Sequence, residues 1–257
     1  MVDYVSFAGN ATSQIVRSGV TDMMDLFGRE INYMRVSVTD LCNLRCRYCM
    51  PASGVRKMEH NDIMSEEEII TVIEAASELG INKIRFTGGE PLLKKNVASI
   101  CRKTSRVPGI NEICLTTNGI LLPHLAVELR DAGVCRINIS LDTLKPERYS
   151  YITRGGSLHE AMLGIDAAIK AGFKVKLNTV MISGFNDDEI PDIARLTHNM
   201  DIDIRFIELM PILEDFSTGK FISSQKVLDT LPELEPLGTM ELLRMFQFKG
   251  ARESTRN

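Results

Sequence analysis

Three cysteines lie within eight residues of one another in the segment Asp40–Pro51, at Cys42, Cys46 and Cys49. A disulfide takes two thiols and a closed tetrahedral zinc site takes four ligands, so three clustered thiols need another explanation. The first residues of the chain lack the basic start and apolar block of a secretory signal. We therefore expect a cytoplasmic protein whose thiols stay reduced and serve as metal or catalytic ligands.

Two kinds of metal centre could use these thiols. Structural zinc would need a fourth ligand, but the nearest histidine, His60, is eleven residues beyond Cys49, and no second cysteine pair has zinc-finger spacing. An iron–sulfur cluster fits better, because three thiolates leave one iron of a [4Fe–4S] cube open to a substrate or cofactor. An open coordination position is typical of catalytic metal sites.

A second motif, Thr-Gly-Gly-Glu-Pro, covers Thr87–Pro91 at the end of a predicted strand. Its glycines let a ligand approach the backbone closely, and Pro91 can begin the next helix. Glu90 offers a carboxylate to a cationic group. A Gly-Gly turn by itself is more often only a tight loop. This one indicates a binding site because of its sequence distance from the cysteines and its place at a strand end.

Strands alternate with helices along the chain, which predicts parallel βαβ units in an α/β fold. The strands begin near Met34, Lys83, Glu112, Arg136, Val175 and Asp203. The helices cover Glu66–Leu79, Lys95–Thr104, Leu121–Ala132, Leu158–Ala171 and Asp187–Leu196, and Ser65 with Glu68 forms a capping box. Six units ending near residue 210 predict a partial (β/α)6 barrel, with a doubly wound open sheet as the alternative.

Several predicted strands alternate polar and apolar residues, although strands covered on both faces should be apolar throughout. The polar sets that share one face are Lys83, Arg85 and Thr87; Arg136, Asn138 and Ser140; and Lys176 with Asn178. If the apolar sets face the helices, the polar sets line a cavity suited to a polar, anionic ligand. The alternative is that these basic residues are solvated strand ends.

The cysteine motif, with Tyr48 just before the third cysteine, resembles the signature of radical S-adenosylmethionine (SAM) enzymes. This resemblance implies one [4Fe–4S] cluster held by Cys42, Cys46 and Cys49, with SAM chelating the fourth iron. It further implies that one electron from the cluster cleaves SAM to a 5′-deoxyadenosyl radical, which abstracts a hydrogen atom from the substrate. The Gly-Gly-Glu-Pro motif resembles the element that holds the methionyl amino group.

A longer series of motifs is similar to the GTP 3′,8-cyclase family of molybdenum-cofactor biosynthesis. The series is Arg35–Cys42, Lys83–Pro91, Thr116–Gly119, Ile137–Asp142, Lys176–Asn178, Gly184–Asp188 and Arg205–Pro211. The resemblance implies a lyase that converts GTP to (8S)-3′,8-cyclo-7,8-dihydroguanosine 5′-triphosphate and receives electrons from a donor protein. It implies SAM contacts at Tyr48, Gly89, Glu90, Thr117, Ser140, Lys176 and Met210, and GTP contacts at Arg35, Lys83 and Arg85.

The resemblance also implies a second [4Fe–4S] cluster on three cysteines beyond the barrel, and the sequence printed here ends before that segment. We therefore expect full cyclisation of GTP by these residues to be weak or absent. Two alternatives stay open: a truncated non-catalytic paralogue, and a radical SAM enzyme with a different substrate. The remaining cysteines, Cys101, Cys114 and Cys135, are expected to be buried apolar residues.

Three regions are expected: an N-terminal extension over 1–24, the barrel over 25–212 and an incomplete C-terminal segment over 213–257. A net charge of −4 argues against nucleic-acid binding, and no apolar run approaches the ~18 residues of a membrane span. A barrel without its closing segment would expose apolar surface along its open side. That surface favours association, for which a homodimer is one form.

Overall fold

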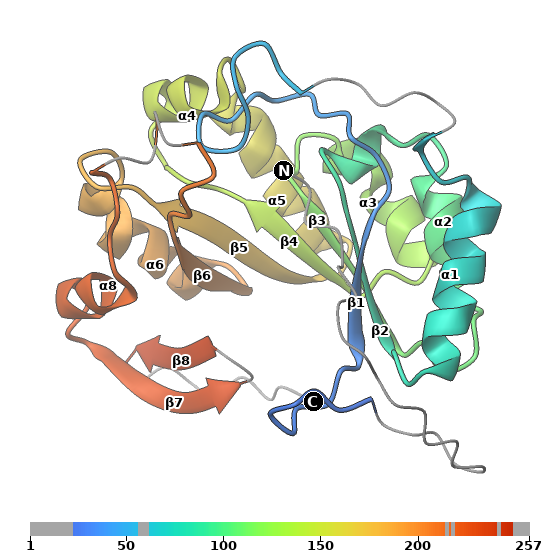
Figure 1. Ribbon diagram of the computed structural model, residues 1–257. Helices are drawn as coiled ribbons and strands as arrows, with labels where there is room; N and C mark the ends of the chain where they lie inside the picture. The colour runs from blue at the N-terminus through green and yellow to red at the C-terminus, as the bar shows by residue number, and fades with distance from the viewer. Residues whose placement is uncertain (1–22, 56–61, 214–215, 217–218, 241–242, 249–257) are drawn as a thin grey trace.

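The computed structural model describes residues 23–55, 62–213, 216, 219–240 and 243–248. This part of the chain forms a six-stranded parallel sheet and a separate two-stranded antiparallel hairpin (Figure 1). The sheet contains β1 (Tyr33–Ser37), β2 (Lys83–Thr87), β3 (Glu112–Thr117), β4 (Arg136–Ser140), β5 (Lys174–Met181) and β6 (Ile202–Glu208). The hairpin contains β7 (Leu234–Met240) and β8 (Leu243–Phe248).

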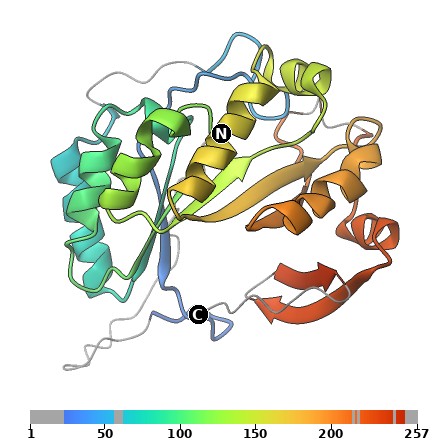
Figure 2. The ribbon, with the colours of Figure 1, turned by 180° about the vertical axis from the view of Figure 1, so that it is seen from behind.

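Helices follow the strands, and most of them cover the outer, convex face of the sheet (Figures 1 and 2). They are α1 (Glu66–Glu78), α2 (Val97–Thr104), α3 (Leu122–Asp131), α4 (Pro146–Thr153), α5 (Leu158–Lys170), α6 (Ile190–Asn199) and α8 (Ser224–Thr230). Strand order in the sheet follows sequence order from β1 to β6. A doubly wound sheet would reverse that order at a switch point, so the predicted partial barrel is confirmed.

The apolar residues of the strands form the core between the sheet and the helices. Ile84 and Phe86 of β2 and Ile137 and Ile139 of β4 are fully buried in one hydrophobic cluster. Because successive side chains of a strand point to opposite faces, the polar residues between them lie on the inner, concave face. The predicted assignment of the apolar sets to the helix side is therefore confirmed.

Local signals placed most helices correctly, with two omissions, α4 and α8. Ser65 accepts a hydrogen bond from the Glu68 amide, and the Glu68 carboxylate accepts one from the Ser65 amide, which confirms the capping box before α1. Helix α4 was not expected from the sequence. It has only eight residues, and its Tyr, Ser, Ile and Thr residues are weaker helix formers than Ala or Leu.

The predicted region boundaries are only partly covered by the described residues. Residues 1–22 of the expected extension lie outside them, and the division near residue 212 stays a prediction. The segment expected over 213–257 contains α8 and the β7–β8 hairpin. None of the helices in the described ranges combines the length and apolar character that crossing a membrane would require.

Helix α5 approaches the turn before α3 so closely that only glycine fits at Gly164. A Cβ atom at Gly164 would overlap the backbone carbonyl oxygen of Gly119. This approach brings α3 and α5 together on the outer face. A helix interior normally prefers alanine to glycine by about 1 kcal/mol, so Gly164 is retained for packing.

We predict that Gly164→Ala lowers the free energy of unfolding by about 1–3 kcal/mol, because the added methyl group forces α5 away from a rigid backbone atom. Urea unfolding followed by circular dichroism measures the change. Leu163→Ala, at a half-exposed neighbouring position of α5, is the control and should cost less. A Gly164→Ala protein as stable as the parent would show that the two helices can separate freely.

Candidate active site

The loop that carries the three cysteines follows β1 and is held against the Gly-Gly turn that follows β2. Backbone amides of Gly89 and Glu90 donate to the carbonyl oxygens of Thr39 (2.8 Å) and Leu41 (2.7 Å). A Cβ atom at Gly89 would overlap the Leu41 carbonyl oxygen, so the contact requires glycine. The cysteine loop therefore starts from a fixed position at the carboxyl ends of the strands.

The carboxyl end of α4 clamps the same loop from the other side, as Figure 1 shows for the blue segment running beside α4. The amides of Arg45 and Arg47 donate to the carbonyl oxygens of Thr153 and Ile152. The guanidinium of Arg154 donates to the carbonyl oxygens of Arg45 (2.6 Å) and Met50 (2.8 Å). These two acceptors bracket Cys46 and Cys49, so one side chain spans the turn that carries both thiols.

Arg154 reaches the loop from a left-handed backbone conformation. Its φ of 57° is the only positive value at a non-glycine residue in the described part of the chain. Such a conformation at a residue with a long side chain is uncommon and costs free energy, so it points to a specific role. Here it ends α4 and turns the guanidinium toward the cysteine loop.

Tyr48, between the second and third cysteines, is fixed by a buried carboxylate. Its hydroxyl donates to Asp142 (2.7 Å), and the other Asp142 oxygen accepts from the Val180 amide (2.9 Å). Burial raises the pKa of Asp142 to about 6. The Tyr48 ring packs against Ile152 and Ile182. The aromatic residue of the motif is thus anchored to the ends of β4 and β5.

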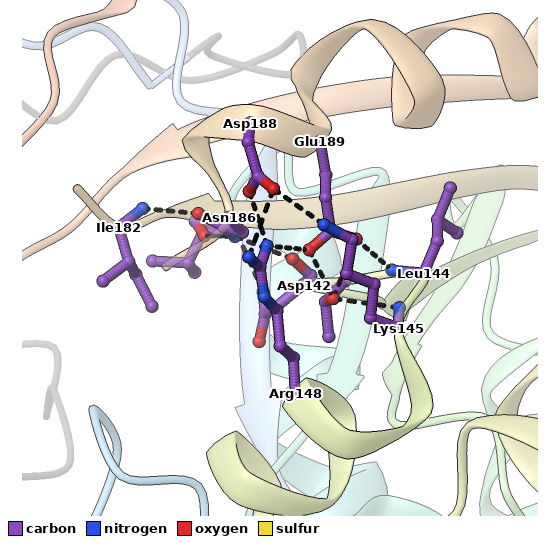
Figure 3. Close-up of polar contacts among 10 residues, drawn as sticks. Asp142, Leu144, Lys145, Arg148, Ile182, Asn186, Asp188 and Glu189 are labelled. Carbon is purple, nitrogen blue, oxygen red and sulfur yellow. Dashed lines mark hydrogen bonds and ion pairs between the residues drawn. The ribbon is translucent and has the colours of Figure 1, made fainter. Parts of the chain in front are cut away.

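A polar network connects the loop after β4 to the loop after β5 (Figure 3). Asn186 donates to the carbonyl oxygens of Asp142 (2.7 Å) and Val180 (2.8 Å). The buried Glu189 carboxylate accepts from the Thr143 hydroxyl and from Arg148 (2.7 Å each). The position of Asp142, and through it of Tyr48, therefore depends on residues of the Gly-Phe-Asn-Asp-Asp motif and its neighbours.

Asp188 adds exposed ion pairs at the edge of this network. Arg148 and Lys145 both contact its carboxylate. Their hydrogen bonds hold the pKa of Asp188 well below its usual range. Because Asp188 is half exposed, these pairs contribute much less than the buried contact between Arg148 and Glu189.

The carboxylate of Glu90, in the second motif, accepts hydrogen bonds from other residues of the protein. The donors are the Leu92 amide, the Thr117 hydroxyl (2.7 Å) and the Asn118 amide (2.7 Å). Asn118 in turn donates to the side-chain oxygen of Asn43 in the cysteine loop (2.7 Å). Burial raises the pKa of Glu90. Glu90 and Thr117 thus tie three loops together, and both are buried among chain atoms.

The inner face of the sheet is polar and rich in cations. One register row places Arg35, Arg85, Cys114, Arg136 and Lys174 side by side on β1 to β5. The next row toward the carboxyl ends contains Thr116, Asn138, Lys176 and Asp203, and the one after it Ser140, Asn178 and Arg205. The alternative that these basic residues are solvated strand ends is wrong for Arg85, whose side chain is buried on this face.

Two acidic residues partly balance these cations. Glu112 pairs with Lys83 (2.9 Å) and Arg136 (3.2 Å), and Asp203 lies 3.6 Å from Lys176. The cations of the inner face are Arg35, Lys83, Arg85, Arg136, Lys174, Lys176 and Arg205. Their excess over acids creates a positive interior that suits an anionic ligand with several charges.

The sequence-predicted site residues fall into three places. Gly89, Tyr48 and the cysteines lie in the loops at the carboxyl ends of the strands, whereas Arg35, Lys83, Arg85, Ser140 and Lys176 occupy the inner face. Thr117 has the same strand parity as the core residues and points away from the inner face. Met210 lies after β6 and is largely exposed.

Sequence reasoning missed residues that position the cysteine loop or lie on the inner face of the sheet. Asp142 ends one motif of the series but had no role assigned to it, and Arg154 carried no local signal, because the partners of both are about a hundred residues away in the chain. Thr116 and Asn138 lie on the inner face with buried polar atoms that have no partner among the described residues. For Asn138 a signal existed, since strand alternation had already placed it in the polar set with Arg136 and Ser140.

The three thiols fit an iron–sulfur cluster better than a single ion. All three are free, and burial raises the pKa of each thiol, so a cation is needed to keep them as thiolates. No group of three histidine, cysteine or acidic side chains close enough for one ion occurs within the described ranges. A cube binds its thiolates through different irons and so tolerates wider spacing. His60, the zinc alternative, lies outside the described residues.

The expectation of buried apolar residues is confirmed for one of the other three cysteines. Cys101 is buried in the main hydrophobic cluster. Cys114 is buried too, but it lies on the polar inner face and its thiol donates to the Glu112 carboxylate. Cys135, just before β4, is only partly buried.

Comparisons with known proteins find relatives over most of this chain. Residues 36–197 match the model of the Radical SAM superfamily. The GTP 3′,8-cyclase of Peptoclostridium acidaminophilum is 53% identical over 224 residues, which cover 86% of this chain and 69% of that protein. The GTP 3′,8-cyclase of Pelotomaculum thermopropionicum is 52% identical over 219 residues, which cover 84% of this chain and 67% of that protein.

Two solved structures share the fold. Streptococcus suis SuiB bound to S-adenosylmethionine matches with a TM-score of 0.65 at 14% identity, over 79% of this chain and 47% of that one. Methylornithine synthase matches with a TM-score of 0.63 at 18% identity, over 77% of this chain and 60% of that one. At these identities the likeness concerns the fold alone.

We predict that Arg154→Gly weakens iron retention without straining the backbone, because glycine adopts the positive φ freely while both hydrogen bonds to the cysteine loop are lost. Hydrogen bonds from a charged donor stabilise by about 1.5–3 kcal/mol, so the reconstituted protein should release iron to a chelator about tenfold faster or more. Arg106→Ala, at an exposed arginine, is the control. Parent-like iron release would contradict a clamp.

We predict that Arg148→Met lowers the free energy of unfolding by about 3 kcal/mol, because the buried Glu189 carboxylate loses its cation. Lys145→Met is the matched control: it removes only the exposed pair with Asp188 and should cost less than about 1 kcal/mol. Urea titration compares the two variants. Equal losses would mean that burial of Glu189 does not depend on Arg148.

Proposed function

We propose that this chain, which belongs to the GTP 3′,8-cyclase family of the radical SAM superfamily, is a radical SAM lyase that acts on GTP. Family membership rests on identities of 53% and 52% to relatives of which the chain covers 69% and 67%. The observation that supports the proposal most directly is the position of three free thiols at the carboxyl-end opening of a cationic interior. Radical generation and an anionic substrate would thus meet at one cavity.

Cys42, Cys46 and Cys49 would hold a [4Fe–4S] cluster, with SAM bound beside it. When bound and reduced, the cluster supplies the electron that cleaves the sulfonium group of SAM, and so the radical that removes a hydrogen atom from the substrate. The chain's own part is to hold the thiols in place, which the Arg154 clamp and the Tyr48–Asp142 hydrogen bond would do.

SAM contacts are assigned to residues at the carboxyl ends of the strands. Tyr48, Gly89 and Ser140 surround this opening, with Lys176 deeper on the inner face and Met210 after β6. Gly89 would present backbone groups, since no side chain fits there. Glu90 and Thr117 would act indirectly, by fixing the turn that carries Gly89.

GTP would bind through its triphosphate to the basic residues of the inner face. Arg35, Lys83 and Arg85 are neighbours there on β1 and β2. The guanidinium of Arg85 is buried, and its Nε has no hydrogen-bond partner among the described residues. Planar guanidinium groups suit phosphate oxygens, and their charges act more strongly in a cavity that excludes water.

We predict that anaerobically reconstituted and reduced protein forms 5′-deoxyadenosine from SAM, and that GTP increases this formation while ATP does not. The reason is that a bound nucleotide offers the hydrogen atom that makes cleavage productive. Chromatographic quantification of 5′-deoxyadenosine, and of cyclised nucleotide in the same samples, makes the measurement. Cys46→Ala, which removes a thiol, is the inactive control.

The outcomes separate the candidate functions. Formation of 5′-deoxyadenosine that is indifferent to GTP would assign the chain to radical SAM chemistry on another substrate. No formation at all, with iron and sulfide bound, would contradict the proposed enzyme and favour a non-catalytic protein.

A further inference from the structure

Asn138 carries a buried side-chain amide that has no hydrogen-bond partner among the described residues. Its side chain is 1% exposed, and neither its Oδ1 nor its Nδ2 atom makes a hydrogen bond within the described part of the chain. Burying an amide without hydrogen bonds costs free energy. In native proteins such a group usually binds a ligand or an ordered water, or has a functional role. Both polar atoms of the Asn138 side chain therefore need a partner that the described part of the chain does not supply.

Two neighbours share this property and point to one site. The hydroxyl oxygen of Thr116 and the Oδ1 atom of Asn178 are also buried, and neither has a hydrogen-bond partner in the ranges that the structure describes. In the sheet, Thr116 is the direct register partner of Asn138, and Asn178 follows one step on, opposite Ser140. Neighbouring strands are about 4.8 Å apart, and two residues along a strand span about 6.6 Å. One group larger than a single ion, lying over Asn138, can therefore reach all three side chains.

The position of Asn138 along its strand indicates which part of a bound nucleotide would contact it. Arg136 lies two residues before Asn138 on the same strand, in the register row that also contains Arg35 and Arg85. Two residues toward the carboxyl ends lies Ser140, at the opening beside the cysteine loop. With a rise of about 3.3 Å per residue, each is roughly 6.6 Å from Asn138 along the strand.

A group between a phosphate-binding row and the opening should be the sugar of a nucleotide. Its hydroxyl groups each donate one hydrogen bond and accept others, and the Asn138 amide offers both an acceptor and a donor. The oxygens of Thr116 and Asn178 extend the same capacity. A phosphate, which only accepts, would leave Oδ1 of Asn138 without a partner.

We propose that Asn138 binds the ribose hydroxyls of the nucleotide substrate and sets the preference for a ribonucleotide over a deoxyribonucleotide. The inference rests on the proposed function, because it takes the substrate to be GTP. It adds a residue that reads the sugar to the cations that would hold the triphosphate. The carboxamide accepts from one hydroxyl through Oδ1 and donates through Nδ2, and no bond is made or broken by it.

Asn138→Leu tests the proposal, because leucine has a similar size and no hydrogen-bonding group. The dissociation constants of GTP, 2′-deoxy-GTP and 3′-deoxy-GTP are measured by calorimetry on reconstituted, unreduced protein. We expect the parent to bind at least one deoxy analogue about tenfold more weakly than GTP, and the variant to bind all three alike. Asn111→Leu, at an exposed asparagine, should keep the parent's preference.

Thermal unfolding separates recognition from a structural role. Since Asn138 makes no hydrogen bond in the described chain, its replacement by leucine should leave the melting temperature unchanged or raise it. A marked fall in melting temperature together with a retained sugar preference would overturn the proposal. If leucine prevents folding, Asn138→Ala allows the same three affinities to be compared.

Two other outcomes decide the matter. An unchanged sugar preference in the variant, or a loss of SAM affinity with GTP affinity intact, would overturn the role of Asn138 while leaving the proposed function standing. Absence of GTP binding by the parent protein would overturn both. The two failures are therefore distinguishable.

Discussion

The candidate active site depends on a backbone contact that side chains would prevent. The turn at Gly88–Gly89 lies directly against the backbone of Thr39–Leu41, with two amide-to-carbonyl hydrogen bonds across the contact. A methyl group at either glycine would overlap main-chain oxygen atoms, which cannot move without displacing a strand end. The position of the cysteine loop relative to the sheet follows from this contact. The clamp from α4 then fixes the far side of the loop.

Buried carboxylates join the loops above the sheet. Glu90 links the turns after β2 and β3, Asp142 links Tyr48 to β5, and Glu189 links the loops after β4 and β5. Each accepts several hydrogen bonds from backbone amides or side chains, which offsets the cost of burying an acidic group. These three acids are therefore satisfied by the protein itself. The basic and amide groups of the inner face are not satisfied to the same degree.

The sequence predicted the strands well, because alternating polar and apolar residues carry the information about which face is buried. The same alternation placed Arg85 and Asn138 on the inner face before the structure was known. The alternation could not decide which of Thr116 and Thr117 points to the inner face, because the two adjacent residues are identical. In the structure Thr117 points away from that face and binds Glu90. The alternation also carries no information about contacts between distant segments. The left-handed Arg154 is the clearest case, because sequence pattern does not predict a rare backbone conformation at a non-glycine residue.

The division between a satisfied rim and an unsatisfied interior explains how the fold can be both stable and ready to bind. Each buried polar group without a partner costs about 1–3 kcal/mol, and the inner face holds such atoms on Arg85, Thr116, Asn138 and Asn178. The outer face compensates with a continuous apolar core beneath the helices. Because the unsatisfied groups sit on strands rather than on loops, they are held in place before a ligand arrives. A ligand that satisfies them then binds without the entropic cost of ordering its site.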